Sequence, residues 1–230
     1  MQRDLIKLLF RVPVALLLAV CPLFAQTANE LPELAAVSRE IKVGETHSYR
    51  KRLEAGQFLN AAVIQEDIDL VTAIFAPDGK QLTESDSPNG NWGSEPVLLV
   101  APVAGEYRIE VRAPGNSARA GHYKIEILAL REATAIDQGH VTAQRALDEG
   151  AKLMRQQTAT AKRTAIEKYQ SALPLFQAAG DTYRVAITNL RLGIAYFSLN
   201  EFRAARQFFE STLALSVALK DRRLEAGTET

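Results

Sequence analysis

The chain has 230 residues, and its 27 basic residues are balanced by 27 acidic ones, so the formal net charge is zero at neutral pH. It lacks the basic excess that is typical of nucleic-acid-binding domains, and we expect no nucleic acid partner. Cys21 is the only cysteine and lies in a segment expected to be removed, so the exported chain is expected to have no disulfide and no thiolate metal site.

The N-terminus has the pattern of a secretory signal peptide. Arg3, Lys7 and Arg11 precede an uncharged apolar run that ends at Ala25. The run is about 14 residues long, whereas a membrane-spanning helix needs roughly 20. We therefore predict a signal peptide over residues 1–25, a periplasmic or extracellular protein with no membrane span after cleavage, and a linker over residues 26–37.

Two alternatives to simple cleavage remain open. Leu23 is larger than the residue usually found three positions before a cleavage site, which leaves a retained N-terminal anchor as one alternative. Cys21 follows a short apolar stretch that resembles a lipoprotein box, although Val20 stands where that motif has a small residue.

Residues 38–131 are predicted to form a β-sandwich. Apolar residues recur there with period two, most clearly where Tyr107, Ile109 and Val111 alternate with charged residues. Turn signals such as the Pro-Asp-Gly of residues 77–79 separate the runs at short intervals. About eight short strands result, and their spacing indicates an antiparallel, jelly-roll-like sandwich.

Few residues of the sandwich have the chemistry of a site. Trp92 lies in a turn-rich loop and is either a ligand platform or a lid on the end of the sandwich. Asp67, Asp69 and Asp86 supply oxygen ligands of the kind that calcium prefers, but their spacing fits no known loop signature, so solvated turn acids are the plainer interpretation. We predict no catalytic residues, no cofactor and no metal.

The three histidines, His47, His122 and His140, have neither metal-binding nor catalytic spacing. We expect them on solvent-facing or rim positions.

After residue 131 the apolar spacing changes to three and four, which indicates helices. We predict a connecting or capping helix over residues 132–158 and paired helices over residues 159–230, with helical patterns at 165–177, 183–199 and 202–219.

The helical part contains an internal repeat of 40 residues. The matched positions are Ala165 with Ala205, Tyr169 with Phe209, Leu173 with Leu213, Leu175 with Leu215, and Asp181 with Asp221. Within one unit, the spacing of Leu192, Gly193, Tyr196, Ala205 and Phe209 resembles the tetratricopeptide repeat. Small residues at 193 and 205 then allow two helix backbones to approach, and aromatic residues at 196 and 209 fill the space beside them.

The resemblance departs from the repeat pattern at Asn189, where a large aromatic residue is usual, and near Val217, where no proline closes the unit. It implies a concave groove lined by Ile187, Leu190, Ile194 and Phe197, which is the candidate surface for a protein or peptide partner. The alternative is that Leu190 and Ile194 pack against the preceding helix. Because stacked repeats bury their faces on neighbours, the last face is expected to be open and to favour self-association.

The sandwich has a resemblance of its own. Short motifs around Gly56, Asp69, Gly79, Gly105 and Gly121 occur in an order that resembles pre-peptidase C-terminal domains. A signal peptide, such a sandwich and tetratricopeptide-type repeats in this order resemble the N-terminal part of secreted bacterial proteins that end in a caspase-like CHAT peptidase domain, and this resemblance implies that the chain is a fragment.

The sequence thus favours an exported, non-enzymatic module for protein–protein interaction. One alternative is the regulatory or substrate-binding region of a secreted caspase-like peptidase. A second alternative, suggested by Trp92 and the acidic turns, is a module that binds carbohydrate or matrix.

Overall fold

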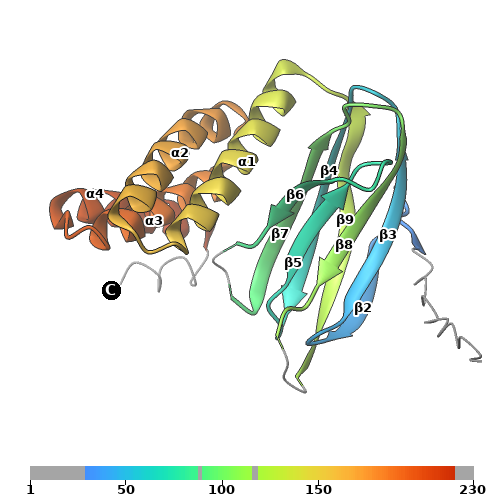
Figure 1. Ribbon diagram of the computed structural model, residues 1–230, viewed down its shortest axis with the longest axis horizontal. Helices are drawn as coiled ribbons and strands as arrows, with labels where there is room; N and C mark the ends of the chain where they lie inside the picture. Colours follow the sequence, from blue (N-terminus) through green and yellow to red (C-terminus); the bar gives the residue numbers. More distant parts are fainter. Residues whose placement is uncertain (1–28, 88–89, 116–118, 221–230) are drawn as a thin grey trace, which may run out of the picture.

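The computed structural model describes residues 29–87, 90–115 and 119–220. These form a β-sandwich followed by four helices (Figure 1). The predicted signal peptide and the repeat positions after residue 220 lie outside the described residues. The strands are β1 (Asn29–Glu30), β2 (Val37–Lys42), β3 (Thr46–Leu53), β4 (Gln57–Glu66), β5 (Val71–Phe75), β6 (Gln81–Ser85), β7 (Trp92–Val100), β8 (Gly105–Arg112) and β9 (Ala120–Glu132).

The strands form two sheets, one with the order β1-β3-β8-β5-β6 and one with the order β2-β9-β4-β7. Strands β2 to β9 are distributed over the two sheets in the order of a jelly roll, four in each sheet, and β5 and β6 follow one another within the same sheet. The expectation of a purely antiparallel sandwich is wrong at one edge, because β1 pairs with β3 in parallel. β1 lies in the stretch expected to be a linker, and Leu31, which follows it, is fully buried in the core.

Alternation along the strands builds the core between the sheets. Tyr107, Ile109 and Val111 of β8 are fully buried, as the period of two predicts. The turn at residues 77–79 reverses the chain between β5 and β6, and Gly79 takes a positive φ of 84° there. Tyr49 and Tyr123 are also buried, and their hydroxyl groups are 2.6 Å apart, which gives each buried polar group a hydrogen-bond partner.

The helices are α1 (Ala135–Met154), α2 (Ala159–Ala178), α3 (Thr182–Phe197) and α4 (Phe202–Leu219). α1 begins two residues after β9, and its start is fixed by a capping box in which Thr134 and Asp137 exchange hydrogen bonds. Arg131, near the end of β9, donates to Asp137 over 2.9 Å. This hydrogen bond is the main reason that the pKa of Asp137 is far below its usual value. The sandwich therefore passes into the helical part through a short, tightly bonded connection.

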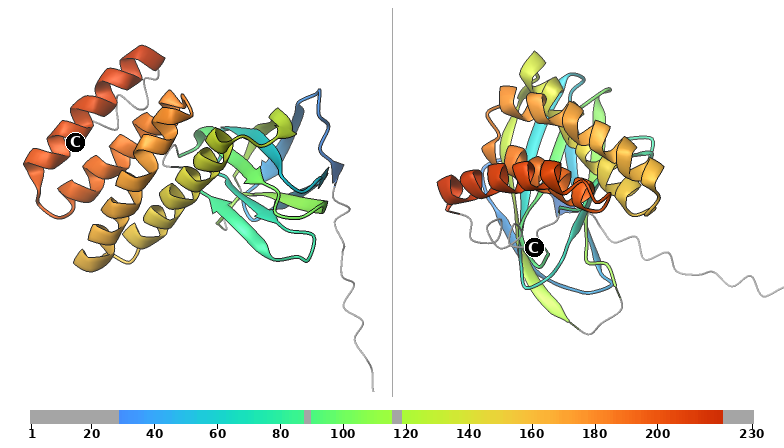
Figure 2. Two further views of the ribbon diagram at one scale, coloured as in Figure 1. Left: turned by 90° about the horizontal axis from the view of Figure 1, so that it is seen from above. Right: turned by 90° about the vertical axis from the view of Figure 1, so that its left-hand side faces the viewer.

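α1 lies beside the sandwich and α4 is farthest from it, with α2 and α3 between them (Figure 2). A glycine allows close approach in each hairpin. A Cβ added to Gly150 of α1 would overlap the ring of Tyr169 in α2, and one added to Gly193 of α3 would lie 2.5 Å from Cε1 of Phe209 in α4. The α1–α2 and α3–α4 hairpins thus repeat the same contact.

The remaining residues of the predicted repeat motif lie close to this contact. Leu192 and Ala205 are buried, as expected for residues between two helices. Tyr196 stacks on Phe208, with ring centroids 5.6 Å apart. Tyr196 therefore fills the space beside Phe208 of α4.

α1 also covers part of the sandwich. Val141 of α1 packs with Phe58 of β4 and Leu98 of β7 in a small apolar cluster that is separate from the core between the sheets. This cluster holds the first helix against one sheet, so the helical part is joined to the sandwich by packing as well as by the chain.

Replacing Gly193 by alanine tests the close α3–α4 contact. Because the ring of Phe209 must move to accept the new methyl group, we expect a loss of about 1–3 kcal/mol in the free energy of unfolding. The matched control is Gly139→Ala in α1, where the added Cβ would meet Leu175 at an ordinary 3.6 Å. This control should gain up to about 1 kcal/mol from helix propensity. Urea unfolding measures both, and equal stabilities for the two variants would contradict the contact.

Candidate functional site

The segment that leaves β6 connects the sandwich to the helices through hydrogen bonds. Ser85 Oγ donates to Asp148 Oδ2 of α1 over 2.7 Å. Two residues later, Ser87 Oγ accepts from Arg184 Nη1 of α3 over 3.2 Å. Arg184 is 5% exposed, so this contact lies inside the molecule.

Asp86, between these two serines, contacts α3 and the residue that follows α1. Its carboxylate accepts from Arg155, which follows α1, over 2.8 Å, and its carbonyl oxygen accepts from Arg191 Nη2 of α3 over 3.0 Å. We call the contacts of residues 85–87 with α1, α3 and Arg155 the junction. Three consecutive residues of the sandwich thereby fix the position of two helices.

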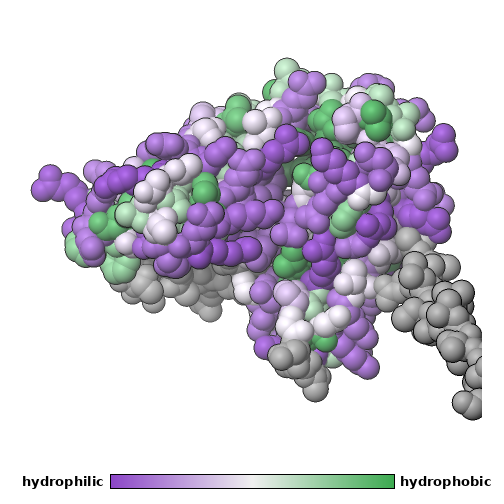
Figure 3. Space-filling model, viewed as in Figure 1, coloured by the Kyte–Doolittle hydropathy of each residue, from purple (hydrophilic) through white to green (hydrophobic). Residues whose placement is uncertain are grey.

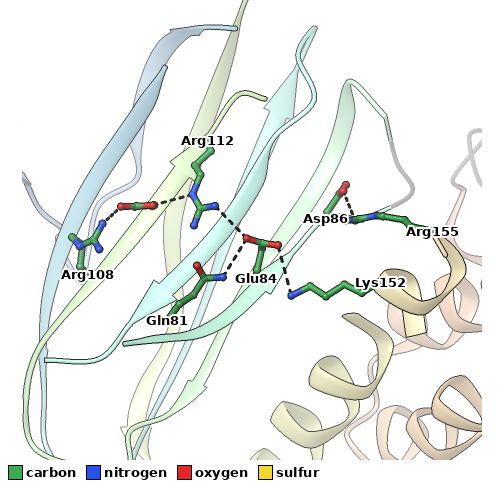
Figure 4. Close-up of polar contacts among 8 residues, drawn as sticks. Gln81, Glu84, Asp86, Arg108, Arg112, Lys152 and Arg155 are labelled. Atoms are coloured by element: carbon green, nitrogen blue, oxygen red, sulfur yellow. Dashed lines mark hydrogen bonds and ion pairs between the residues drawn. The ribbon is translucent and has the colours of Figure 1, made fainter. Parts of the chain in front are cut away.

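Beside the junction, a separate chain of ion pairs crosses the outer face of one sheet and ends at α1 (Figure 4). Its members, in spatial order, are Arg108, Glu110, Arg112, Glu84 and Lys152. Burial opposes ionisation of Glu84, but the hydrogen bond from Gln81 and the charges of Lys152 and Arg112 outweigh it, so the pKa of Glu84 is lowered. The charged face of the sheet thus reaches α1 through Lys152.

Asp148 is the most perturbed acid of the junction. Burial raises the pKa of Asp148 to about 7, although hydrogen bonds from Ser85 and Gln144 and the charges of Arg184 and Lys152 act in the opposite direction. A serine beside an acid of this pKa has the composition of a nucleophile and base. Ser85, however, is only 4% exposed, so a substrate has no approach to its hydroxyl group. The pair is a structural contact between β6 and α1.

The other candidate site is an apolar pocket of about 360 Å³ on the α3–α4 hairpin. Its lining residues are Phe197, Phe202, Ala205, Arg206, Phe209, Glu210 and Leu213. Phe197, Phe202 and Leu213 are 48%, 57% and 43% exposed, and all three line this one pocket. Single exposed apolar side chains are common on proteins, but a group of them in one place is informative. Figure 3 shows hydrophobic side chains gathered at this end of the molecule, over α4, within a largely hydrophilic surface.

The structure divides the partner-binding residues expected from the sequence. Ile187 and Leu190 are buried in the helical core, so the prediction that they line an open groove is wrong, and the burial of Leu190 agrees with the alternative that it packs within the helical part. Ile194 and Phe197 are exposed, and Phe197 lines the pocket. The sequence interpretation missed Phe202 and Leu213, although the match of Leu213 with Leu173 was a signal that pointed to this face.

The candidate residues of the sandwich lie apart from the pocket. Trp92 is the first residue of β7 and is 37% exposed. Of the three acids considered for calcium, Asp86 is paired with Arg155. In the part of the chain that the structure describes, no group of three or more His, Cys, Asp or Glu side chains is placed to hold a metal ion.

Two of the histidines are less exposed than expected. His140 Nε2 is 2.9 Å from Asp181, the N-cap residue of α3, and its side chain is 12% exposed. His47 Nδ1 is 2.8 Å from the Tyr123 hydroxyl, and burial is the main reason that its pKa is lowered. His122 lies on the exposed surface of β9, as expected.

Comparisons with known proteins give only distant likenesses. No family model matches the chain, and no curated protein is similar to it. One similar solved structure is the pre-peptidase C-terminal domain of collagenase from Bacillus anthracis, with 16% identity over 44% of this chain and 93% of that chain and a TM-score of 0.36. Another is PliG from Aeromonas hydrophila, a periplasmic inhibitor of g-type lysozyme, with 17% identity over 44% of this chain and 96% of that chain and a TM-score of 0.34.

The first of these is a domain of the type that the sandwich motifs resemble. At such identities and TM-scores neither likeness carries an argument about function. Among the described helices, none is long and apolar enough to cross a membrane.

The substitution Asp148→Asn tests the burial of this carboxyl group. Folded Asp148 keeps its proton up to a pH of about 7, whereas in the unfolded chain it releases the proton near its usual value of 3.8. Between these values the unfolded state binds fewer protons, so the contribution of Asp148 to stability falls as the pH rises. Asparagine has the same shape as aspartate but carries no charge. The free energy of unfolding of the variant, relative to that of wild type, should therefore rise by at least about 1 kcal/mol from pH 5 to pH 8.

Urea unfolding of wild type and Asp148→Asn at these two pH values measures the effect. Other titrating groups cancel in the difference between the two proteins. A difference that stays constant with pH would contradict the buried position of the carboxyl group.

Proposed function

We propose that this chain is an exported, non-enzymatic module for protein–protein interaction, in which tetratricopeptide-type hairpins bind the partner and the sandwich supports them. The observation that carries the proposal is the open apolar pocket of the α3–α4 hairpin. Large exposed apolar side chains that are grouped on one face are typical of protein-binding surfaces.

The internal repeat supports the choice of this surface. In the first hairpin, α2 is covered by the end of α3 and the turn that follows it. Lys162 donates to the Ser198 carbonyl over 3.1 Å, and Gln170 donates to the Tyr196 hydroxyl over 3.0 Å. The corresponding face of α4 carries the pocket. The helix face that is covered on α2 of the first hairpin is thus exposed on α4 of the second hairpin.

In this proposal the sandwich positions the hairpins through the junction. Because residues 85–87 bond to α1, to α3 and to Arg155, the sandwich holds the hairpins in one arrangement before any partner arrives. A preorganised surface loses less conformational entropy on binding. Export is proposed from the pattern of residues 1–25, and the absence of enzymatic activity from the lack of a catalytic pattern in the sequence.

A photo-crosslinking amino acid tests this proposal. Benzoylphenylalanine in place of Phe202 puts the crosslinker in the pocket, and the same residue in place of Leu128, which is 59% exposed on β9, is the matched control. In the producing cell, position 202 should give crosslinked protein bands that position 128 does not give. Adding Leu213→Asp should weaken these bands at least about tenfold, because a charge then lies in the apolar contact.

Since Leu213 is 43% exposed, the aspartate should leave the fold intact, which circular dichroism checks. Identical bands at positions 202 and 128, or bands that are insensitive to Leu213→Asp, would exclude the pocket as the binding surface.

A further inference from the structure

The outward face of α4 forms one continuous stripe. Phe202, Arg206, Phe209, Leu213 and Val217 follow one another at spacings of four and three, so they lie on one side of the helix. Phe202 and Val217, near the two ends of the stripe, are 57% and 59% exposed. We call these five residues the α4 face.

The charges on this face are arranged around its midpoint. Arg206 lies within the stripe and Glu210 beside it, and the two side chains form an exposed ion pair with an N–O distance of 2.7 Å. They stand at equal distances along the helix from residue 208. Consider a second α4 that runs antiparallel to the first, with the two helices crossing at residue 208 of each. Arg206 of each copy then lies opposite Glu210 of the other copy.

The corresponding face of α2 differs at these two positions. The 40-residue repeat places Ile166 where α4 has Arg206, and Gln170 where it has Glu210. Ile166 is buried, and Gln170 bonds to Tyr196 of α3. At these two positions the face of α2, which is covered within the chain, is uncharged. The exposed face of α4 carries two opposite charges there, and their arrangement is self-complementary.

From this arrangement we infer that the α4 face binds a second copy of this chain, with the two α4 helices antiparallel across a two-fold axis near residue 208. The inference rests on the proposed function, because it names the partner of the same pocket. A two-fold interface brings the same surface of both copies together, which requires self-complementarity of the kind seen here.

One register satisfies the apolar and the charged positions together. With a rise of about 1.5 Å per residue, pairing Arg206 with the partner's Glu210 places Phe202 beside the partner's Leu213. The two Phe209 side chains, each packed against Gly193 of its own α3, then lie near the axis. Val217 extends past the end of the partner's α4 towards the partner's Phe197, which is also exposed. The contact that pairs the charges would thus also bury four exposed apolar side chains of the hairpin, those of Phe197, Phe202, Leu213 and Val217.

A charge-exchange experiment tests this inference on the chain from Gln26 onward, which contains every described residue. Arg206→Glu alone places glutamates opposite glutamates in the dimer, and Glu210→Arg alone places arginines opposite arginines. We expect wild type to sediment as a dimer at micromolar concentration and each single variant to dissociate at least about tenfold more readily. A mixture of the two variants should form a heterodimer, since every pair across the axis is then attractive.

The double variant Arg206→Glu/Glu210→Arg is the second control. It keeps an attractive pair between positions 206 and 210 within each helix, and it should dimerise like wild type. Each single variant has like charges at these two positions of its own helix, and this remains true in the mixture. Recovery in the mixture therefore reports on contacts between copies, and it also shows that each single variant is folded.

A monomeric wild type would overturn the inference, and so would single variants that remain dimeric or a mixture that remains monomeric. These results leave the proposed function standing if crosslinks from position 202 to a different protein are lost with Leu213→Asp. If wild type dimerises but position 202 gives no crosslinks to a different protein, the α4 face serves self-association and the proposed binding of another protein is wrong.

Discussion

The position of the helical part depends on the polar contacts that residues 85–87 make with α1, α3 and Arg155. Three consecutive residues supply two hydroxyl groups, a carboxylate and a carbonyl oxygen, and these bond to Asp148, Arg155, Arg184 and Arg191. Buried polar groups are costly without partners, so each contact favours the single arrangement that satisfies all of them. The apolar contact of Val141 with the sheet and the capped start of α1 act in the same direction.

The contacts of the junction also determine how the exposed end of the molecule is presented. The two hairpins share one kind of close contact, glycine against an aromatic ring. The second hairpin covers the first through the contacts of α3 and the turn after it with α2. The α4 face is where this stacking ends among the described residues. Because the sandwich fixes α1 and α3, the face is presented in one orientation, as a two-fold contact between copies requires.

Periodicity predicted most of the fold and little of the junction. The alternation around Tyr107 and the helix breaks near Gly180 and Asn200 are local signals, and the structure has a strand and helix ends there. Ser87 and Arg184 are 97 residues apart in sequence, and nothing local indicates that they meet. Helical spacing likewise marks an apolar face without showing what covers it. For that reason the helical spacing predicts an open groove at Ile187 and Leu190, which the structure buries, and does not single out the exposed Phe202 and Leu213.

The most direct test of the junction is the distance distribution between two spin labels, one on each part of the molecule. Arg52 on β3 and Glu167 on α2 are both exposed, and the chain from Gln26 onward has no cysteine, so two introduced cysteines can be labelled specifically. The labelled protein is diluted with an excess of unlabelled protein, so that distances between copies of a dimer do not contribute, and pulsed electron spin resonance should then give one narrow distribution if the junction is intact. A broad distribution, or two separate distances, would show that the helices move relative to the sandwich and would contradict the fixed arrangement described above.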